Sequence, residues 1–89
     1  MFRLWVREFK DNHMLTDTVV AEEGDDTRTH KVMSALGEAC VRLDLARPIW
    51  LDTNISEFKT CSKTRFRADS FVEDIEFDYL EIQVIEEDY

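Results

Sequence analysis

Apolar and polar residues alternate over residues 2–10, FRLWVREFK. One parity begins with the apolar residues Phe2, Leu4 and Val6, and the other combines arginine with aromatic side chains: Arg3, Trp5, Arg7 and Phe9. A period of two predicts a half-buried strand. Asp11-Asn12-His13 can form a turn, because Asx side chains tolerate left-handed backbone geometry. Residues 14–22, MLTDTVVAE, are rich in Thr and Val and predict a second strand. The two segments together predict an N-terminal β-hairpin.

The spacing changes to that of a helix after the polar break at residues 22–26. Asp26 or Thr27 can cap a helix that runs to about Leu45, and Pro48 follows it. Its apolar positions form one stripe at helical spacing: Val32, Leu36, Ala39 and Leu43, with Met33 and Cys40 beside them. Gly37 lies within this helix and costs roughly 1 kcal/mol relative to alanine. A close backbone contact with the sheet would explain the glycine, and so would flexibility.

The middle of the chain predicts shorter elements. Residues 48–52, PIWLD, form a brief apolar run that fits a short strand or a loop. Asn54 with Glu57 three residues later resembles a capping box and predicts the start of a short second helix. After this helix, residues 64–71 are expected to be extended.

The last segment, residues 71–86, alternates strongly but changes its parity near Asp78 and Tyr79. We predict one long final strand that bends at this point. The expected architecture over residues 1–89 is a single small α+β domain. An N-terminal hairpin and a long C-terminal strand form an antiparallel sheet, which one main amphipathic helix and a short second helix cover.

Charge is distributed unevenly along this chain of 89 residues, whose net charge is -9. Residues 71–89 contain no Lys or Arg and eight acids: Glu73, Asp74, Glu76, Asp78, Glu81, Glu86, Glu87 and Asp88. Glu81 and its neighbours are expected to line a solvated strand face. Direct binding to nucleic acid or to an anionic membrane is disfavoured, because both need a broad basic surface. No apolar run approaches the 18 residues of a membrane span.

Catalytic and metal-binding patterns are weak. Cys40 lies on the apolar helix stripe and predicts a buried free thiol. Cys61 with His13 or His30 is the available nucleophile–base pairing, and nothing in the sequence brings these residues together. The same four side chains lack the close pairs of zinc sites, and there is no glycine-rich phosphate loop. We therefore expect a non-enzyme without metal or cofactor, in a reducing cytoplasmic setting.

A small basic cluster interrupts this acidic chain at residues 61–70, CSKTRFRADS. Lys63, Arg65 and Arg67 are candidate docking residues, because two extended-strand arginines can hold one carboxylate or phosphate. The alternative is that they pair with the acidic tail across strands, where exposed pairs contribute about 0–1 kcal/mol. Trp5 is a further docking candidate, since aromatic residues framed by arginine are typical of interface centres.

The stretches RPIWLDTNISEF, SKTRF and FDYLEIQVIEED resemble segments of short bacterial proteins of about 90 residues, a family without known function. The resemblance implies a bacterial cytoplasmic protein and assigns no role to any residue. Our first hypothesis is a non-catalytic protein-interaction or adaptor domain, which docks or self-associates through the final strand or the Trp5 face. The alternatives are an acidic inhibitor that mimics nucleic acid and a small-anion sensor that uses Arg65 and Arg67.

Overall fold

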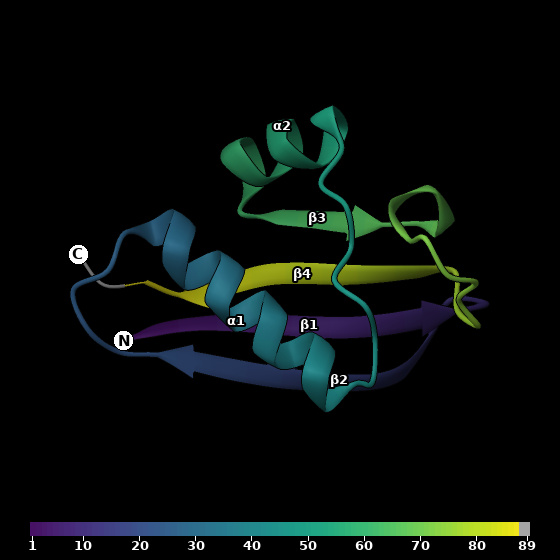
Figure 1. Cartoon of the computed structure of the whole chain (residues 1–89), viewed down its shortest axis with the longest axis horizontal. Coiled ribbons are helices and arrows are strands. Elements are labelled where there is room, and N and C mark those ends of the chain that lie inside the picture. Colours follow the sequence, from purple (N-terminus) through teal and green to yellow (C-terminus); the bar gives the residue numbers. More distant parts are fainter. Residues whose placement is uncertain (88–89) are drawn as a thin grey trace.

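The computed structural model describes residues 1–87 of the chain. Strands and helices follow one another as in Figure 1: β1 (Phe2–Lys10), β2 (His13–Glu22), α1 (Arg28–Arg42), α2 (Asp52–Cys61), β3 (Lys63–Phe66), the 3₁₀ turn η1 (Ala68–Ser70) and β4 (Tyr79–Glu86). The predicted α+β class, the N-terminal hairpin and the C-terminal strand are confirmed.

The hairpin of β1 and β2 closes through a two-residue turn. Asp11 and Asn12 have φ values of 52° and 66°. Two consecutive positive φ angles match the right-handed twist of hairpin strands, and Asp and Asn tolerate this geometry better than most residues. A register shift between Glu8 and Phe9 marks a bulge near the turn.

The sheet is antiparallel, with the strand order β2-β1-β4-β3. The final strand β4 therefore lies between β1 and β3, so its edges are already paired. It begins at Tyr79, where the sequence changes parity, and residues 71–78 form no strand. The expectation of one bent strand from residue 71 was wrong. The alternating aromatic residues Phe71 and Phe77 instead pack edge-to-face in a loop beside the core, with centroids 5.9 Å apart.

The main helix α1 starts where the sequence predicts and ends earlier. Thr27 caps it, with its hydroxyl accepting a hydrogen bond from the backbone N–H of His30 at 3.2 Å. The helix ends at Arg42 rather than near Leu45, because Asp44 adopts a left-handed φ of 56°. Residues 47–51 then form a loop without a strand.

Asn54 fixes the second helix α2 to the sheet, but it does not begin that helix. The helix starts at Asp52, and Asn54 Oδ1 accepts a hydrogen bond from the backbone N–H of Leu51 at 3.0 Å. Its Nδ2 donates to Thr64 Oγ1 at 3.0 Å and to the Arg65 carbonyl at 2.9 Å. The bond to the Arg65 carbonyl lies on the outer side of β3, so α2 contacts this edge of the sheet.

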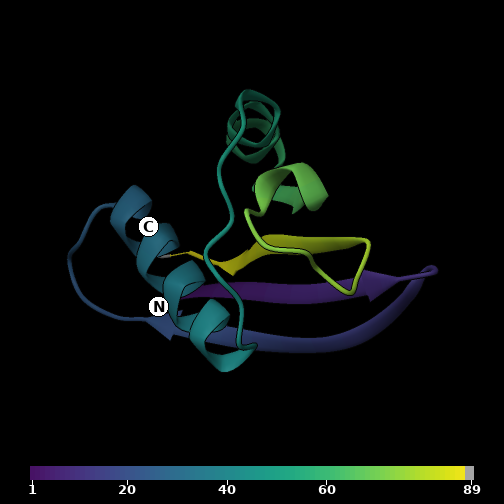
Figure 2. The ribbon, with the colours of Figure 1, turned by 45° about the vertical axis from the view of Figure 1, so that its right-hand side comes forward.

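Both helices pack on the same face of the sheet (Figures 1 and 2). The core between them contains apolar residues from every strand and both helices: Phe2, Leu4, Val6, Val20, Val32, Ala35, Leu36, Ala39, Cys40, Phe58, Phe66, Phe77, Leu80 and Ile82. Cys40 is buried and free, as predicted. The opposite face of the sheet carries no helix among residues 1–87. Within these residues, no helix is long and apolar enough to cross a membrane.

Candidate functional site

The face of the sheet that no helix covers, here called the open face, is built from three rows of side chains across the strands. The register places Lys63, Gln83, Trp5 and Val19 in one row, Arg65, Glu81, Arg7 and Asp17 in the next, and Tyr79, Phe9 and Met14 in the third. These residues belong to alternate positions whose neighbours, such as Leu80 and Ile82, lie in the core. The central row alternates in charge, and the outer rows are mainly aromatic or apolar.

Glu81 is the centre of the open face and is almost completely buried, with 4% of its surface exposed. Its Oε1 lies 2.6 Å from Arg7 Nη2, and its Oε2 accepts a hydrogen bond from Arg65 Nε at 2.7 Å. The bond to Glu81 raises the pKa of Arg65. A carboxylate between two guanidinium groups joins β3, β4 and β1, and it holds both arginine side chains in place. The expectation that Glu81 is solvated was wrong, because long neighbouring side chains cover it.

Trp5 and Arg7 form a stacked pair beside this carboxylate. The Arg7 Cζ lies 3.8 Å from the centroid of the Trp5 ring, within the range of a cation–π contact. Trp5 Nε1 donates to Asp17 Oδ2 at 2.8 Å, and Arg7 Nη2 also donates to Gln83 Oε1 at 2.8 Å. The indole is therefore fixed at its polar end and on one face. Such fixed aromatic groups lose little conformational entropy when a partner binds.

A second aromatic pair lies at the other end of the face. The rings of Phe9 and Tyr79 stack with centroids 5.2 Å apart. The guanidinium carbons of Arg65 and Arg67 lie 4.6 Å and 5.7 Å from the Tyr79 ring centroid. Tyr79 is thus framed by two arginines, as Trp5 is by Arg7.

The structure brings the four docking residues predicted from sequence to this side of the sheet. Lys63 and Trp5 both lie opposite Gln83, Arg65 is in the central row, and Arg67 lies beside Tyr79. The basic cluster was expected either to dock a partner or to pair with the acidic tail, and its members differ in this respect. Arg65 pairs with a carboxylate of the C-terminal segment, whereas the side chains of Lys63 and Arg67 make no hydrogen bond or ion pair within residues 1–87.

Sequence reasoning missed Glu81, Tyr79 and Gln83 as parts of the same surface. A usable signal was present, because these three residues alternate with the buried Leu80 and Ile82. Recognising it required knowing that β4 is central and that Arg7 and Arg65 come from the strands on either side of it.

The open face differs in charge from the rest of the molecule. Three cations and two carboxylates lie in its three rows, and two cations and one carboxylate lie beside them: Arg7, Lys63, Arg65, Asp17 and Glu81, and Arg3, Arg67 and Glu86. The chain as a whole carries 20 acids and 11 Lys or Arg residues. Most of the acidic excess therefore lies elsewhere, and the open face has a local positive balance.

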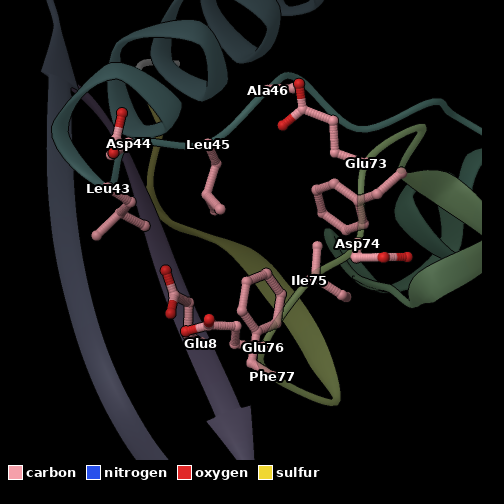
Figure 3. Close-up of a pocket in the computed structure, with 11 residues that line it drawn as sticks. Glu8, Leu43, Asp44, Leu45, Ala46, Glu73, Asp74, Ile75, Glu76 and Phe77 are labelled. Atoms are coloured by element: carbon pink, nitrogen blue, oxygen red, sulfur yellow. The ribbon is translucent and has the colours of Figure 1, made fainter.

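Part of this acidic excess surrounds a hollow of about 310 Å³ at the far end of the core (Figure 3). Apolar side chains, among them Phe71 and Phe77, line it together with five carboxylates: Glu8, Asp44, Glu73, Asp74 and Glu76. Burial raises the pKa of Glu8 above its ordinary value of 4.5. Asp88, the last acid counted in the sequence, lies outside the described residues.

The candidate catalytic side chains are dispersed over the fold. Cys61 is exposed at the end of α2, and His30 on α1 lies 2.8 Å from Asp26 through its Nδ1. The hydrogen bond from His30 lowers the pKa of Asp26. Within residues 1–87, no group of three or more His, Cys, Asp or Glu side chains is arranged to hold a metal ion.

The fold and the open face define a small α+β domain with one helix-covered and one uncovered sheet face. Comparison with protein-family models, curated proteins and solved structures gives no match for this chain. The contacts within the open face are therefore the basis for a proposed function.

Proposed function

We propose that this chain is a non-catalytic protein-interaction domain that binds a partner protein through the open face. The observation that supports this function is the arrangement around Glu81, where Trp5 and Tyr79 lie beside arginines held by one buried carboxylate. Trp, Tyr and Arg are the residues most enriched at interface hot spots. A surface of this composition, fixed before binding, is suited to docking a folded partner.

The charge of the open face specifies the chemistry of the partner. Lys63 and Arg67 lack ionic partners within residues 1–87, and both are exposed. A partner with acidic groups around an apolar or aromatic centre would complement them. A second copy of the chain meeting face to face would instead bring like charges together, so we favour a different protein. Direct nucleic-acid binding is not proposed, because the net charge of -9 opposes it at longer range.

The test is affinity capture from a bacterial lysate with the wild type and two charge-reversal variants. Lys63→Glu/Arg67→Glu reverses two charges beside or on the open face. The control, Lys10→Glu/Lys59→Glu, reverses two exposed cations elsewhere, so both variants change the net charge of the chain by the same amount. We expect the wild type and the second variant to retain a partner that the first variant loses, with all three showing cooperative melting.

Equal retention by both variants would contradict docking on the open face. Equal loss would show that net charge alone determines binding. A captured partner whose surface is basic rather than acidic would also contradict the proposed complementarity.

A second candidate function, an acidic inhibitor that mimics nucleic acid, is favoured by the carboxylates around the hollow in Figure 3. It predicts that capture of a DNA- or RNA-handling protein depends on these acids and weakens steeply with salt. Glu73→Gln/Glu76→Gln would then lose the partner, while Lys63→Glu/Arg67→Glu would keep it.

The small-anion alternative receives less support from the contacts. Arg65 Nε already donates to Glu81, and the hollow lined by Arg65 and Arg67 also contains Glu57 and Asp69. Their carboxylates would repel a bound anion. We also propose a cytoplasmic location, where the free thiols of Cys40 and Cys61 would stay reduced.

A further inference from the structure

The outer edge of β2 and the adjacent side of α1 enclose a groove that is separate from the open face. Its volume is about 490 Å³. The strand contributes residues 20–22, and α1 contributes Ser34, Gly37, Glu38 and Val41 at helical spacing. Arg47, in the loop after α1, also lines the groove.

The strand side of this groove presents unpaired backbone groups. β2 is the last strand of the sheet and pairs with β1 alone. Arg42 Nη1 donates to the Val19 carbonyl at 2.9 Å, so this carbonyl points away from β1. Because inward and outward peptide groups alternate in an antiparallel strand, those of Asp17, Val19 and Ala21 all face outward. Within residues 1–87, no other hydrogen bond to these groups is present, so the edge can accept a further strand.

The helix side of the groove is shaped to hold the Arg47 side chain. A Cβ at Gly37 would lie 2.3 Å from Arg47 Nη2 and 2.6 Å from its Cζ. The guanidinium group therefore rests directly on the helix backbone, which glycine alone permits. This contact explains the glycine within α1: the close neighbour of its backbone is Arg47, not the sheet.

The charges in the groove leave Arg47 without a counterion. Glu22 Oε1 accepts a hydrogen bond from the Ser34 hydroxyl at 2.8 Å, and Glu38 lies 3.4 Å from Arg42 Nε. The Arg47 side chain makes no hydrogen bond or ion pair within residues 1–87. Among the described residues, Arg47 is therefore a cation without a direct ion pair beside the strand edge, and Glu22 keeps its negative charge in the same groove.

We propose that this groove binds an extended segment of another protein, which adds a strand to β2 and places an acidic side chain against Arg47. The backbone of β2 would supply hydrogen bonds, and Arg47 would select a carboxylate at one position of the segment. The β2 strand of a second copy of the chain does not fit this description of the bound segment. The one carboxylate in the middle of that strand, Asp17, is already held by Trp5. Docking also requires Arg42 to release the Val19 carbonyl.

Two synthetic peptides test this assignment: acetyl-Thr-Val-Thr-Glu-Thr-Val-Thr-amide and the same peptide with Gln in place of Glu. Alternation places Val, Glu and Val on one side of the extended peptide. Titrated into the ¹⁵N-labelled chain, the Glu peptide is expected to shift the amide resonances of Asp17, Val19 and Ala21. It should bind about two- to fivefold more tightly than the Gln peptide, because a partly exposed ion pair with Arg47 contributes only this much to the affinity. A Glu peptide with N-methylated backbone amides should not bind.

Two variants of the chain separate the role of Arg47 from general stability. Arg47→Gln should bind both peptides equally. Gly37→Ala should do the same, because its Cβ displaces the flexible guanidinium group, and its melting temperature should equal or exceed that of the wild type. The open face is unchanged in both variants, so capture of its partner should be unaffected.

Three results would overturn the proposal. One is no shift of the β2 amides with either peptide at about 5 mM, and another is an unchanged Glu preference in both variants. The third is a concentration-dependent shift of the same amides without peptide, which would assign the edge to pairing between copies of the chain.

Discussion

The carboxylate of Glu81 is expected to be the most sensitive polar group of the sheet. Its side chain is 6% exposed, and that of its partner Arg7 is 11% exposed. Arg7 Nε is buried without a hydrogen-bond partner within residues 1–87, and the polar contacts of this guanidinium group are made by Nη2 with Glu81 and Gln83. Removing the carboxylate would leave a buried guanidinium group without its counterion.

The magnitude follows from the burial of the two ion pairs. Removing one member of a buried pair costs about 3–5 kcal/mol, because the remaining charge is desolvated without compensation. The side chain of Arg65 is 45% exposed, so its pair with Glu81 contributes about 0–1 kcal/mol. The amide of Glu81→Gln can still accept one hydrogen bond. We therefore expect a loss of about 2–4 kcal/mol in the free energy of unfolding.

Glu86→Gln is the matched control on the same strand. The Glu86 carboxylate is 45% exposed and lies 3.7 Å from Arg3, so its loss should cost less than about 0.5–1 kcal/mol. Urea unfolding of the wild type and both variants, with an unchanged slope m, measures the difference. An Arg7→Met/Glu81→Met double variant should be more stable than Glu81→Gln, because it removes both buried charges. Equal stabilities of Glu81→Gln and Glu86→Gln would refute the reasoning.

Three further predictions concern other parts of the fold. Burial raises the pKa of Glu8 above 4.5, so its ionisation opposes folding at neutral pH; Glu8→Gln should be more stable than the wild type at pH 7, with the gain vanishing below pH 4.5 in urea unfolding. Asn54→Ala should lower the free energy of unfolding by about 2–4 kcal/mol, because it leaves the Leu51 N–H and the Arg65 carbonyl without their partner and removes one of the two hydrogen bonds of the Thr64 hydroxyl, whereas Asn12→Gly in the hairpin turn should change it by less than about 1 kcal/mol. Arg42→Ala should bind the Glu peptide more tightly than the wild type, because the Val19 carbonyl at the β2 edge is then already uncovered; equal affinity in the same titration would contradict this role.

The local elements could be predicted from sequence because their signals are local. Alternation located β1 and β2, and Asp11 and Asn12 adopted the left-handed turn that their side chains allow. The apolar stripe located α1, with Thr27 as its cap. Each of these features depends on residues that are close together in the chain.

The remaining features depend on contacts between distant residues. The alternation before Tyr79 resembled a strand, but it arises from loop side chains that pack beside the core. Asn54 takes part in a capping box, but at the third position of α2, where its Oδ1 accepts from the N–H of Leu51 and its Nδ2 donates to β3. The open face was predicted only through Trp5 and the basic cluster. The burial of Glu81 between two arginines depends on strand order, which no local pattern specifies.

The most direct test of docking on the open face uses the two tryptophans of the chain as internal reporters. Trp5 lies on the open face, whereas Trp50 packs edge-to-face against Phe58 and Phe66 beside the core. Titration of the ¹⁵N-labelled chain with the captured partner should shift the indole N–H resonance of Trp5 and leave that of Trp50 in place. A bound complex in which the Trp5 resonance does not move would contradict the assignment of the open face as the docking surface.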